Sequence, residues 1–427
     1  MKIIADKNIP YIDEAFSHLG QVHKLPGRGI TADVVRDADM LLVRTVTQVN
    51  KSLLSDSKVR FVGSATIGYD HIDLSYLNDR KIGFSSAAGC NANSVGEYVS
   101  AALLVLANRH GFSLSGKTIG IIGTGNTGSS VAAKARALGM HVLLNDPPLA
   151  RKTADPVYLP LDQVIRESDV LTFHVPLSDT GQDATLHMGN DKFFDSLNQG
   201  PFLINSSRGP VIHTEALLRA LKRGVLRGAV IDVWENEPDI SCPLLELVDI
   251  GTPHIAGYSR DGKANATFLI YQAACSFFGQ AASWKPKNLP KPAHPVIHIS
   301  ERSPDGISHS QDKNAETQNQ NDVIHIHKDE SQNQSEHSIG ISRHTEEILA
   351  DIVRKGYDIE EDDRALRIML SKPDDQRGSC FEQLRNEYPV RREFHSMKII
   401  GENIDANLIN TLKGLGFCHE PETIVSG

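Results

Sequence analysis

Short apolar runs alternate with segments of helical spacing through the first 290 residues of the chain. These runs have the length and composition of strands that are buried on both faces. They occupy residues 2–5, 40–44, 60–63, 118–122, 141–145, 170–174, 202–205, 228–232 and 248–252. Between them, apolar side chains recur at the 3.6-residue period of a helix, as in residues 93–109, 129–138, 214–223 and 263–279. Buried strands separated by helices predict doubly wound parallel sheets of the α/β class.

The number of strands predicts two such domains, because nine strands exceed one mononucleotide-binding unit. We assign residues 1–92 and 256–290 to one domain and residues 93–255 to the other. The predicted helix at residues 263–279 then returns the chain to the first domain.

The composition changes after Trp284. Residues 291–344 are rich in Pro and then in Ser, Gln, Asn, Asp, Glu and His. Such a segment buries too little apolar surface to offset its ordering entropy, so we predict a mobile linker. Two copies of VIHI, at residues 296–299 and 323–326, are candidate short strands within it. The histidines of this segment follow no metal-ligand spacing, and no metal site is predicted.

Periodicity returns in residues 345–427. Helices are predicted at residues 346–355, 381–387 and 406–415, and a strand at residues 397–400. These elements predict a small α+β domain at the C-terminus.

Charge and cysteine content restrict the partners and the compartment. The net charge of −9 repels phosphates and disfavours a nucleic-acid partner. No apolar run approaches the ~20 residues that span a bilayer, and the first residues lack the features of a signal peptide. The five cysteines are far apart and form no CxxC pair, which favours buried free thiols over bridges or metal ligands. We therefore expect a cytoplasmic protein without a membrane or nucleic-acid partner.

The clearest motif is GTGNTG at residues 123–128, which follows a predicted strand and opens a helix. Gly123 permits the tight turn, Gly125 lets a pyrophosphate approach the backbone, and Gly128 allows the helix to pack on the strand. With Asn126 and Thr127, these glycines present the free amides of a helix N-terminus to phosphates.

A carboxylate at the end of the next predicted strand specifies the cofactor further. Asp146 lies where an acidic residue binds the hydroxyl groups of the adenosine ribose, and it would repel a 2′-phosphate. Proline residues follow it instead of an arginine. The sequence therefore predicts NAD rather than NADP.

Three polar residues follow later strands, at the edge where ligands of open α/β sheets bind. They are Arg208, Glu237 and His254. Oxidation of a secondary alcohol needs a base, which histidine supplies near neutral pH. A carboxylate such as Glu237 stabilises the imidazolium and fixes the tautomer, while an arginine binds a substrate carboxylate as a fork. Asp232 ends its strand, where it either accepts a hydrogen bond from the nicotinamide amide or caps the following turn.

Five motifs in order make the chain similar to the D-isomer-specific 2-hydroxyacid dehydrogenases. They are SATIGYDHID, GTGNTG, NSSRGPVIHTEAL, DVWENEP and TPHIAGYS. The resemblance implies two Rossmann-like domains, NAD as cofactor, and Arg208, Glu237 and His254 as catalytic residues. It also places Val175, Ser206, Ser207, Arg208 and Gly257 near the cofactor.

A narrower resemblance connects the chain to a branch of this family that oxidises 4-phospho-D-erythronate to 2-oxo-3-hydroxy-4-phosphobutanoate in vitamin B6 (pyridoxal phosphate) synthesis. RTVTQVN, GCNANSVGEYV, YDIEEDDRALR and FEQLRNEYPVRREF carry it, the last two in the C-terminal domain. This branch implies a homodimer formed through that domain and substrate contacts at Thr45, Thr66 and Tyr258. The polar segment at residues 300–338 has no counterpart in the branch, and Thr45 replaces a serine.

The phosphate of such a substrate requires cations. Arg44, beside the predicted substrate loop, is the first candidate, and a solvated arginine is the alternative. Arg391 and Arg392 in the C-terminal domain are alternatives that could reach the site of a partner subunit, but we favour a solvated or interface role for them. Two other functions stay open: a dehydrogenase for 3-phosphoglycerate or another D-2-hydroxy acid, and an NAD-responsive binding protein of the corepressor type.

Overall fold

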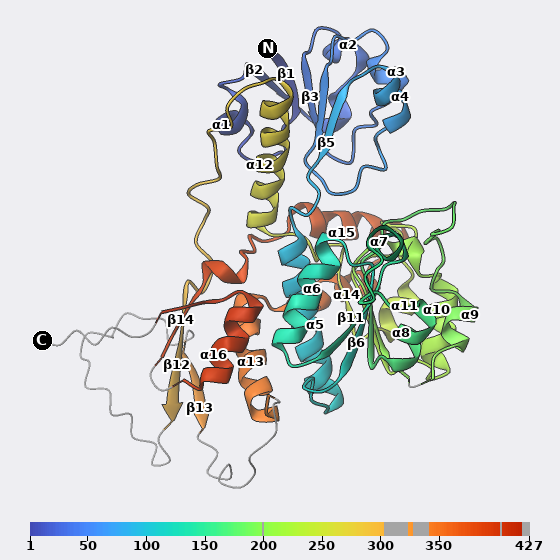
Figure 1. Ribbon diagram of the computed structural model, residues 1–427, viewed down its shortest axis with the longest axis vertical. Helices are drawn as coiled ribbons and strands as arrows, with labels where there is room; N and C mark the ends of the chain where they lie inside the picture. Colours follow the sequence, from blue (N-terminus) through green and yellow to red (C-terminus); the bar gives the residue numbers. More distant parts are fainter. Residues whose placement is uncertain (199, 303–322, 328–340, 402–403, 421–427) are drawn as a thin grey trace, which may run out of the picture. The chain divides into compact units, whose positions relative to one another are not determined.

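The computed structural model describes residues 1–198, 200–302, 323–327, 341–401 and 404–420 (Figure 1). It divides into two compact units, Met1–Asn93 with Tyr258–Pro290, and Ser94–Gly257 with Lys291–Gly427. Each unit is built on a parallel sheet. Short 3₁₀ helices are η1 (Gly27–Gly29), η2 (Gly209–Val211), η5 (Ile368–Ser371) and η6 (Phe394–Ser396).

The first unit has a five-stranded sheet in the order β2-β1-β3-β4-β5. Its strands are β1 (Lys2–Asp6), β2 (Gln21–Leu25), β3 (Met40–Val43), β4 (Phe61–Ser64) and β5 (Gly83–Ser86). Side chains alternate between two cores because successive strand residues point to opposite faces. In β3, Met40 and Leu42 pack against α1 (Ile12–Phe16) and α12 (Arg260–Phe277). Leu41 and Val43 face α2 (Ala32–Val35), α3 (Lys51–Leu54) and α4 (Leu74–Asp79).

The second unit contains a six-stranded sheet in the order β11-β10-β9-β8-β6-β7. Its strands are β6 (Thr118–Ile122), β7 (His141–Asn145), β8 (Val170–Phe173), β9 (Phe202–Asn205), β10 (Gly228–Ile231) and β11 (Ile250–Gly251). Tyr158 extends the β7 edge through a parallel bridge to Leu144. All strands run parallel, and the order in which they are connected reverses between β6 and β8, which is the switch point where doubly wound folds bind ligands.

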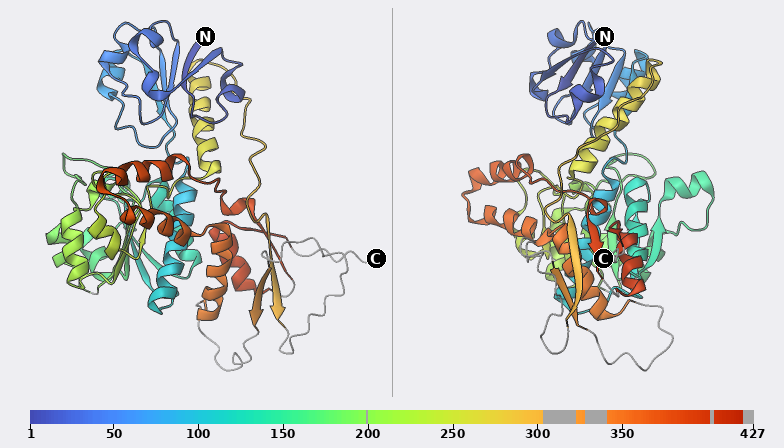
Figure 2. Two further views of the ribbon diagram at one scale, coloured as in Figure 1. Left: turned by 180° about the vertical axis from the view of Figure 1, so that it is seen from behind. Right: turned by 90° about the vertical axis from the view of Figure 1, so that its left-hand side faces the viewer.

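Helices cover both faces of this sheet (Figures 1 and 2). One face carries α5 (Ala92–His110) and α6 (Asn126–Ala137), and the short helix α7 (Pro147–Thr153) follows β7. The other face packs against α8 (Leu161–Glu167), α9 (Asp191–Asp195), α10 (Thr214–Lys222) and α11 (Cys242–Leu247). The doubly wound architecture predicted from the sequence is confirmed for both sheets.

The C-terminal part of the second unit has a sheet of its own, in the parallel order β13-β12-β14-β15. Its strands are β12 (Val296–Arg302), β13 (Val323–His327), β14 (Lys398–Ile400) and β15 (Cys418–His419). Its helices are α13 (Arg343–Gly356), α14 (Ile359–Arg367), α15 (Asp374–Asn386) and α16 (Ala406–Leu415), and Figure 2 shows α13 and α16 beside the sheet.

Two features differ from the expectations. Both copies of VIHI lie in strands, with Ile297, Ile299 and Ile324 buried, so the two candidate strands are confirmed and these stretches are not part of a linker. The rest of the polar segment, residues 303–322 and 328–340, lies outside the described residues. Arg391 and Arg392 are buried within the chain rather than solvated, because acidic and aromatic groups surround the guanidinium of Arg391.

The cysteines are free, and they are less buried than expected. Cys275 alone of the five is buried, while Cys418 is exposed. In the described part of the chain, no helix is long and apolar enough to cross a membrane.

Candidate active site

The glycine loop lies at the switch point of the second unit. Gly123 follows β6 with φ +87°, and a Cβ there would lie 2.6 Å from the carbonyl oxygen of His174. Gly128 leaves no room either, because its Cβ would lie 2.0 Å from the carbonyl oxygen of Gly123. Gly125 faces open space, since a Cβ at this position would have no neighbouring atom within 4 Å. The loop is therefore closed toward the sheet and open where a pyrophosphate would approach.

Asp146 connects the end of β7 to this loop. Its Oδ2 accepts hydrogen bonds from the amide (2.8 Å) and hydroxyl (3.2 Å) of Thr124, and its Oδ1 caps α7 by accepting from Leu149 N (3.0 Å). Oδ1, which accepts one hydrogen bond, keeps a lone pair for a further donor. The carboxylate is thus held in a fixed position beside the loop, where ribose hydroxyls of a dinucleotide would find an acceptor.

Two buried polar atoms near the switch point have no hydrogen-bond partner among the residues that the structure describes. They are His174 Nδ1 and Ser206 Oγ, just beyond β8 and β9. Burial lowers the pKa of His174 to about 3, so the imidazole is neutral, with Nε2 held by Thr172 Oγ1 at 2.9 Å. Buried polar atoms without partners are rare in folded proteins and mark sites completed by a ligand. Together with the open Gly125, they fit a bound dinucleotide.

Other predicted cofactor residues surround the same edge of the sheet. Val175 lies against the glycine loop, because its Cγ1 would be 2.8 Å from a Cβ at Gly123. Ser207 is held in place by its own loop, because its amide and its hydroxyl both donate hydrogen bonds to Asn205 Oδ1. Asn126 and Thr127 begin α6, and Asn126 is exposed.

His254 and Glu237 form a hydrogen-bonded pair. Nδ1 of His254 lies 2.8 Å from Oε2 of Glu237, whose Oε1 accepts from Trp234 N at 2.9 Å. Burial by itself would raise the pKa of Glu237, but the hydrogen bond and charge of His254, with smaller effects of Trp234 N–H and Arg385, outweigh it and lower this pKa. An ionised Glu237 fixes the Nδ1–H tautomer of His254 and leaves Nε2 as a proton acceptor.

The backbone of His254 is strained, with φ +58° in the left-handed region that non-glycine residues rarely adopt. Asp232, which is 1% exposed, holds this loop in place. Its Oδ1 accepts from Ile255 N and Thr252 Oγ1, both at 2.7 Å, and its Oδ2 accepts from Ala256 N at 3.1 Å. Desolvation raises the pKa of Asp232 against the opposing effects of His254 and these donors.

Asp232 therefore fills one of the two roles considered for it and leaves the other open. It caps the turn after β10, and Oδ2 retains an acceptor site toward which a nicotinamide amide can donate. The cofactor contact itself stays a prediction.

Arg208 lies on a neighbouring loop. Among the described residues its side chain makes one hydrogen bond, from Nη1 to its neighbour's carbonyl, Ser207 O, at 2.8 Å. The adjacent Gly209 packs so tightly that its Cβ would lie 1.9 Å from Trp234 O, which brings this loop against the one that carries Glu237. Glu237 and His254 are thus in direct contact, whereas Arg208 is connected to them only because its loop packs against the loop that carries Glu237.

Predicted substrate residues lie in the first unit, at the carboxyl ends of its strands. Thr66 Oγ1 donates to Gly68 O (3.0 Å) and lies 2.8 Å from Ser64 Oγ, whereas the side chain of Thr45 is exposed. Arg44 follows β3, and Tyr258 begins the segment that leads into α12.

Two further cations near Arg44 were missed from the sequence. Burial lowers the pKa of Lys263, and the positive charges of Arg44 and Arg260 lower it further. The Lys263 ammonium lies 4.5 Å from the ring centre of Tyr258, and the guanidinium of Arg260 lies 5.5 Å from that of Tyr11. No carboxylate forms an ion pair with any of these three cations in the described part of the chain. We call Arg44, Arg260 and Lys263 the cationic cluster, and its sequence signal was the RDGK that follows the His254 motif.

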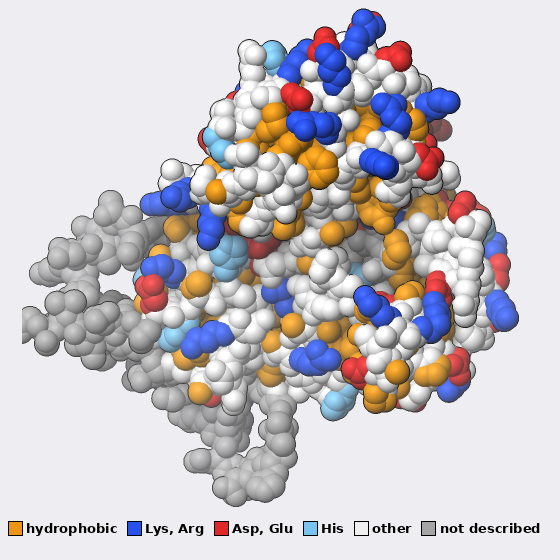
Figure 3. All heavy atoms as spheres, turned by 45° about the horizontal axis from the view of Figure 1, so that its top comes forward, with side chains coloured by type: hydrophobic (Ala, Val, Ile, Leu, Met, Phe, Trp, Pro, Cys, Tyr) orange, Lys and Arg blue, Asp and Glu red, His pale blue; other side chains and the backbone are white. Residues whose placement is uncertain are grey.

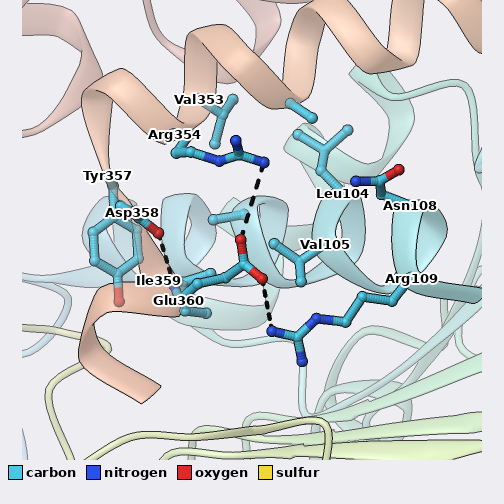
Figure 4. A pocket seen from close by; sticks show the side chains of 12 residues that line it. Leu104, Val105, Asn108, Arg109, Val353, Arg354, Tyr357, Asp358, Ile359 and Glu360 are labelled. Atoms are coloured by element: carbon cyan, nitrogen blue, oxygen red, sulfur yellow. Dashed lines mark hydrogen bonds and ion pairs between the residues drawn. The ribbon is translucent and has the colours of Figure 1, made fainter. Parts of the chain in front are cut away.

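A pocket elsewhere in the second unit contains none of these residues. It lies between α5 and the C-terminal helices α13 and α14, and Figure 4 shows Glu360 directed at both Arg109 and Arg354 across it. Three of its charged side chains, Arg109, Arg354 and Glu360, are paired with one another. Among the described residues there is no cluster of metal-ligating side chains, and on the face in Figure 3 basic and acidic side chains are interspersed.

Comparison with known proteins supports the assignment of the second unit. Residues 98–256 match the family model described as D-isomer specific 2-hydroxyacid dehydrogenase, NAD binding domain. Residues 333–416 match a domain of unknown function, DUF3410.

Two curated relatives align with nearly the whole chain. It is 40% identical over 414 residues to an erythronate-4-phosphate dehydrogenase from Proteus mirabilis (strain HI4320), which covers 96% of this chain and 98% of the relative. It is 41% identical over 418 residues to an erythronate-4-phosphate dehydrogenase from Yersinia pestis (strain Pestoides F), covering 98% and 99%.

A solved structure matches a shorter part. D-lactate dehydrogenase from Aquifex aeolicus, complexed with NAD and lactic acid, is 26% identical with a TM-score of 0.52, and covers 65% of this chain and 96% of that chain. The two curated relatives therefore match nearly the whole of this chain, including its C-terminal part. The solved structure covers only 65% of the chain.

Proposed function

The chain belongs to the D-isomer specific 2-hydroxyacid dehydrogenase family, and within it we propose that the protein oxidises 4-phospho-D-erythronate to 2-oxo-3-hydroxy-4-phosphobutanoate. It is an NAD-dependent oxidoreductase. The proposal places the reaction in the synthesis of pyridoxal 5′-phosphate.

The hydrogen-bonded pair of His254 and Glu237 carries the proposal, because alcohol oxidation needs a base beside a hydride acceptor. Nε2 of His254 takes the proton of the substrate's C2 hydroxyl, and Glu237 stabilises the imidazolium that forms. Arg208 binds the carboxylate of the substrate. When bound, NAD⁺ accepts the hydride that leaves C2. Its proposed contacts are the glycine loop, Asp146 and residues that follow β8 to β11, namely Val175, Ser206, Ser207, Asp232 and Gly257.

The cationic cluster supports a phosphorylated substrate. Three cations without a carboxylate partner are costly to hold together, because like charges repel and partial burial removes their hydration. A dianionic phosphate would relieve both effects. We assign Arg44, Arg260 and Lys263 to the phosphate, and Thr45, Thr66 and Tyr258 to the rest of the substrate. The names of the curated relatives point to the same substrate class.

We further propose a cytoplasmic homodimer formed through the C-terminal part. Ile368 and Val390 are large apolar side chains there that are 57% and 61% exposed in the single chain. Free thiols, as in all five cysteines, are typical of reducing compartments. Light scattering coupled to size-exclusion chromatography measures the mass, and a value near the monomer mass of 46.8 kDa would contradict the dimer.

Initial rates of NAD⁺ reduction with three acids test the substrate. We expect kcat/KM for 4-phospho-D-erythronate to exceed that for 3-phosphoglycerate and D-lactate by at least about 100-fold, as for a site whose polar groups match one ligand. A preference for 3-phosphoglycerate would show that the substrate is a different acid, while the reaction would still be the oxidation of a 2-hydroxy acid. NADH binding without turnover of any acid would instead favour a binding protein of the corepressor type.

A further inference from the structure

The C-terminal part packs directly on the NAD-binding sheet of its own chain. Helix α14 lies along the edge strand β11, where Asp363 Oδ1 accepts from Gly251 N at 2.7 Å. Arg367 donates to Leu245 O (2.7 Å) and Val248 O (2.8 Å) in the same region. An edge strand presents unpaired backbone groups, and Asp363 satisfies one of them, Gly251 N. Arg367 binds carbonyl groups of α11 and of the segment that leads into β11. The contact is thus built into the domain that carries His254.

Helix α15 continues this packing to the loop that carries Glu237. Phe381 is fully buried in the core beneath the sheet. At the point of closest approach α15 has Gly378, where a Cβ would lie 2.5 Å from Asp239 Oδ1. One turn beyond Phe381, Arg385 Nη1 lies 3.8 Å from Glu237 Oε2. This is the oxygen that also accepts the hydrogen bond of His254.

Arg391 makes a second connection to the His254 loop. Its Nη2 donates to Ser94 O at 2.8 Å and its Nη1 to Ala256 O at 3.4 Å, while the guanidinium stacks 3.7 Å from the ring centre of Tyr357. The C-terminal part therefore contacts both halves of the catalytic pair: Glu237 through Arg385, and the loop of His254 through Arg391.

We propose that Arg385 is a positioning residue for the Glu237–His254 pair, so that the C-terminal part contributes to proton transfer in its own chain as well as to assembly. The proposal rests on the proposed function, in which His254 is the base. Arg385 holds the Glu237 carboxylate toward His254 and offsets part of its negative charge. That offset prevents His254 from binding its proton so strongly that it no longer acts as a base.

The direction of the effect follows from the charges that face His254. They are Glu237 and Asp232, which favour imidazolium, and Arg385, which opposes it through Glu237. Removal of the Arg385 charge leaves the two carboxylates less compensated, so His254 should keep its proton to a higher pH. The displacement is therefore upward, and partial exposure of the Arg385–Glu237 contact keeps it modest.

A titration that needs no substrate tests this displacement. The full-length protein is labelled at histidine ¹³Cε1, the His254 signal is identified by its loss in His254→Gln, and its midpoint is measured by NMR. Arg385→Met keeps an apolar stem against Phe381 and removes the charge, Arg385→Lys keeps the charge, and Arg377→Gln is the control on the same helix, where Arg377 pairs with Asp374.

We expect the His254 midpoint to rise in Arg385→Met and to remain at the wild-type value in Arg385→Lys and Arg377→Gln. An unchanged midpoint in Arg385→Met overturns the proposal, as does an equal rise in Arg385→Lys or Arg377→Gln. If Arg385→Met does not fold, Arg385→Gln is used in its place, and its midpoint decides in the same way.

Kinetics provide the second readout. The acidic limb of the kcat/KM profile for oxidation should move up with the midpoint, which lowers kcat/KM about threefold below that limb and leaves it unchanged above. A loss of rate that is equal at every pH would mark a merely structural residue and overturn the proposal. Lack of turnover in the wild-type protein refutes the proposed function alone, because the NMR titration still decides the role of Arg385.

Discussion

His254 Nδ1 lies 2.8 Å from Glu237 Oε2, and this bond decides which ring nitrogen is available for chemistry. With the proton of the neutral ring on Nδ1, Nε2 keeps a lone pair, which in the proposed mechanism accepts the hydroxyl proton. The left-handed backbone of His254 indicates that its neighbours hold the residue in a fixed position, because strain of this kind persists only where the surrounding structure maintains it.

Replacement of His254 by Ala should lower kcat by about 10²–10⁴-fold, the range that a positioned acid or base contributes. The dissociation constant of NADH, followed by nicotinamide fluorescence, should change less than about threefold, since the glycine loop is untouched. A parallel loss of NADH binding would show that His254 supports the structure rather than the reaction.

The central strands could be predicted from the sequence because they are apolar on both faces. The central strands β6 and β9 have the predicted bounds, and so does the edge strand β7, whose sequence HVLLN is largely apolar. β2 and β5 were missed because they are edge strands whose residues are mostly half-buried, so their composition is mixed. The position of an edge strand follows from pairing, which periodicity does not report.

The candidate site could be predicted in part for the same reason. Residue types and strand ends indicated Glu237 and His254. The anchoring of the His254 loop by Asp232 and the approach of Arg385 depend on which surfaces pack together. Such tertiary contacts between segments far apart in the chain leave no local pattern, and they became visible only in the folded molecule.

The glycines of the loop should separate cofactor binding from folding. Gly125→Val places its side chain in open space, at an ordinary φ of −63°, and should leave the urea midpoint unchanged while it raises the NADH dissociation constant by at least ~10-fold. Gly128→Ala instead forces a methyl group against Gly123 O and should lower stability by about 1–3 kcal/mol. Equal losses of stability in the two variants would contradict this division.

Asp232 should be required for the geometry of the His254 loop. In Asp232→Ala three donors, Ile255 N, Ala256 N and Thr252 Oγ1, lose a buried acceptor. We expect a loss of ~3 kcal/mol in the free energy of unfolding, together with a kcat at least ~10-fold lower.

Asp249→Ala is the matched control for Asp232→Ala. Asp249 Oδ2 accepts from Ala229 N at 2.9 Å, near the start of the strand that ends at Asp232. This variant should lose stability but keep the kcat of the folded enzyme. The free energy of unfolding is measured by urea unfolding, and kcat is measured from rates at saturating substrate. An unchanged kcat in Asp232→Ala would contradict the positioning of His254 by this carboxylate.

Glu97 should make stability depend on pH. It is completely buried beside Arg391 and accepts from Phe394 N at 2.8 Å, and burial raises its pKa to about 8. An acid whose pKa is higher in the folded state binds a proton on folding, so stability should fall as pH rises from about 4.5 to about 8. Glu97→Gln mimics the protonated form and should flatten this part of the curve. The comparison uses urea unfolding at pH 5, 6.5 and 8, with the exposed Glu167→Gln as control; parallel curves for wild type and Glu97→Gln would contradict it.

The cationic cluster should distinguish a phosphorylated acid from the same acid without phosphate. A charge-assisted hydrogen bond to phosphate contributes about 1.5–3 kcal/mol, which corresponds to roughly 10–100-fold in kcat/KM. Arg44→Ala and Lys263→Ala should each lose that factor with 4-phospho-D-erythronate and less than about threefold with D-erythronate. Arg36→Ala, an exposed arginine of the same unit that pairs with Asp33, should affect neither. Equal losses with both acids would remove the cluster from the phosphate and leave it a role in the stability of the first unit.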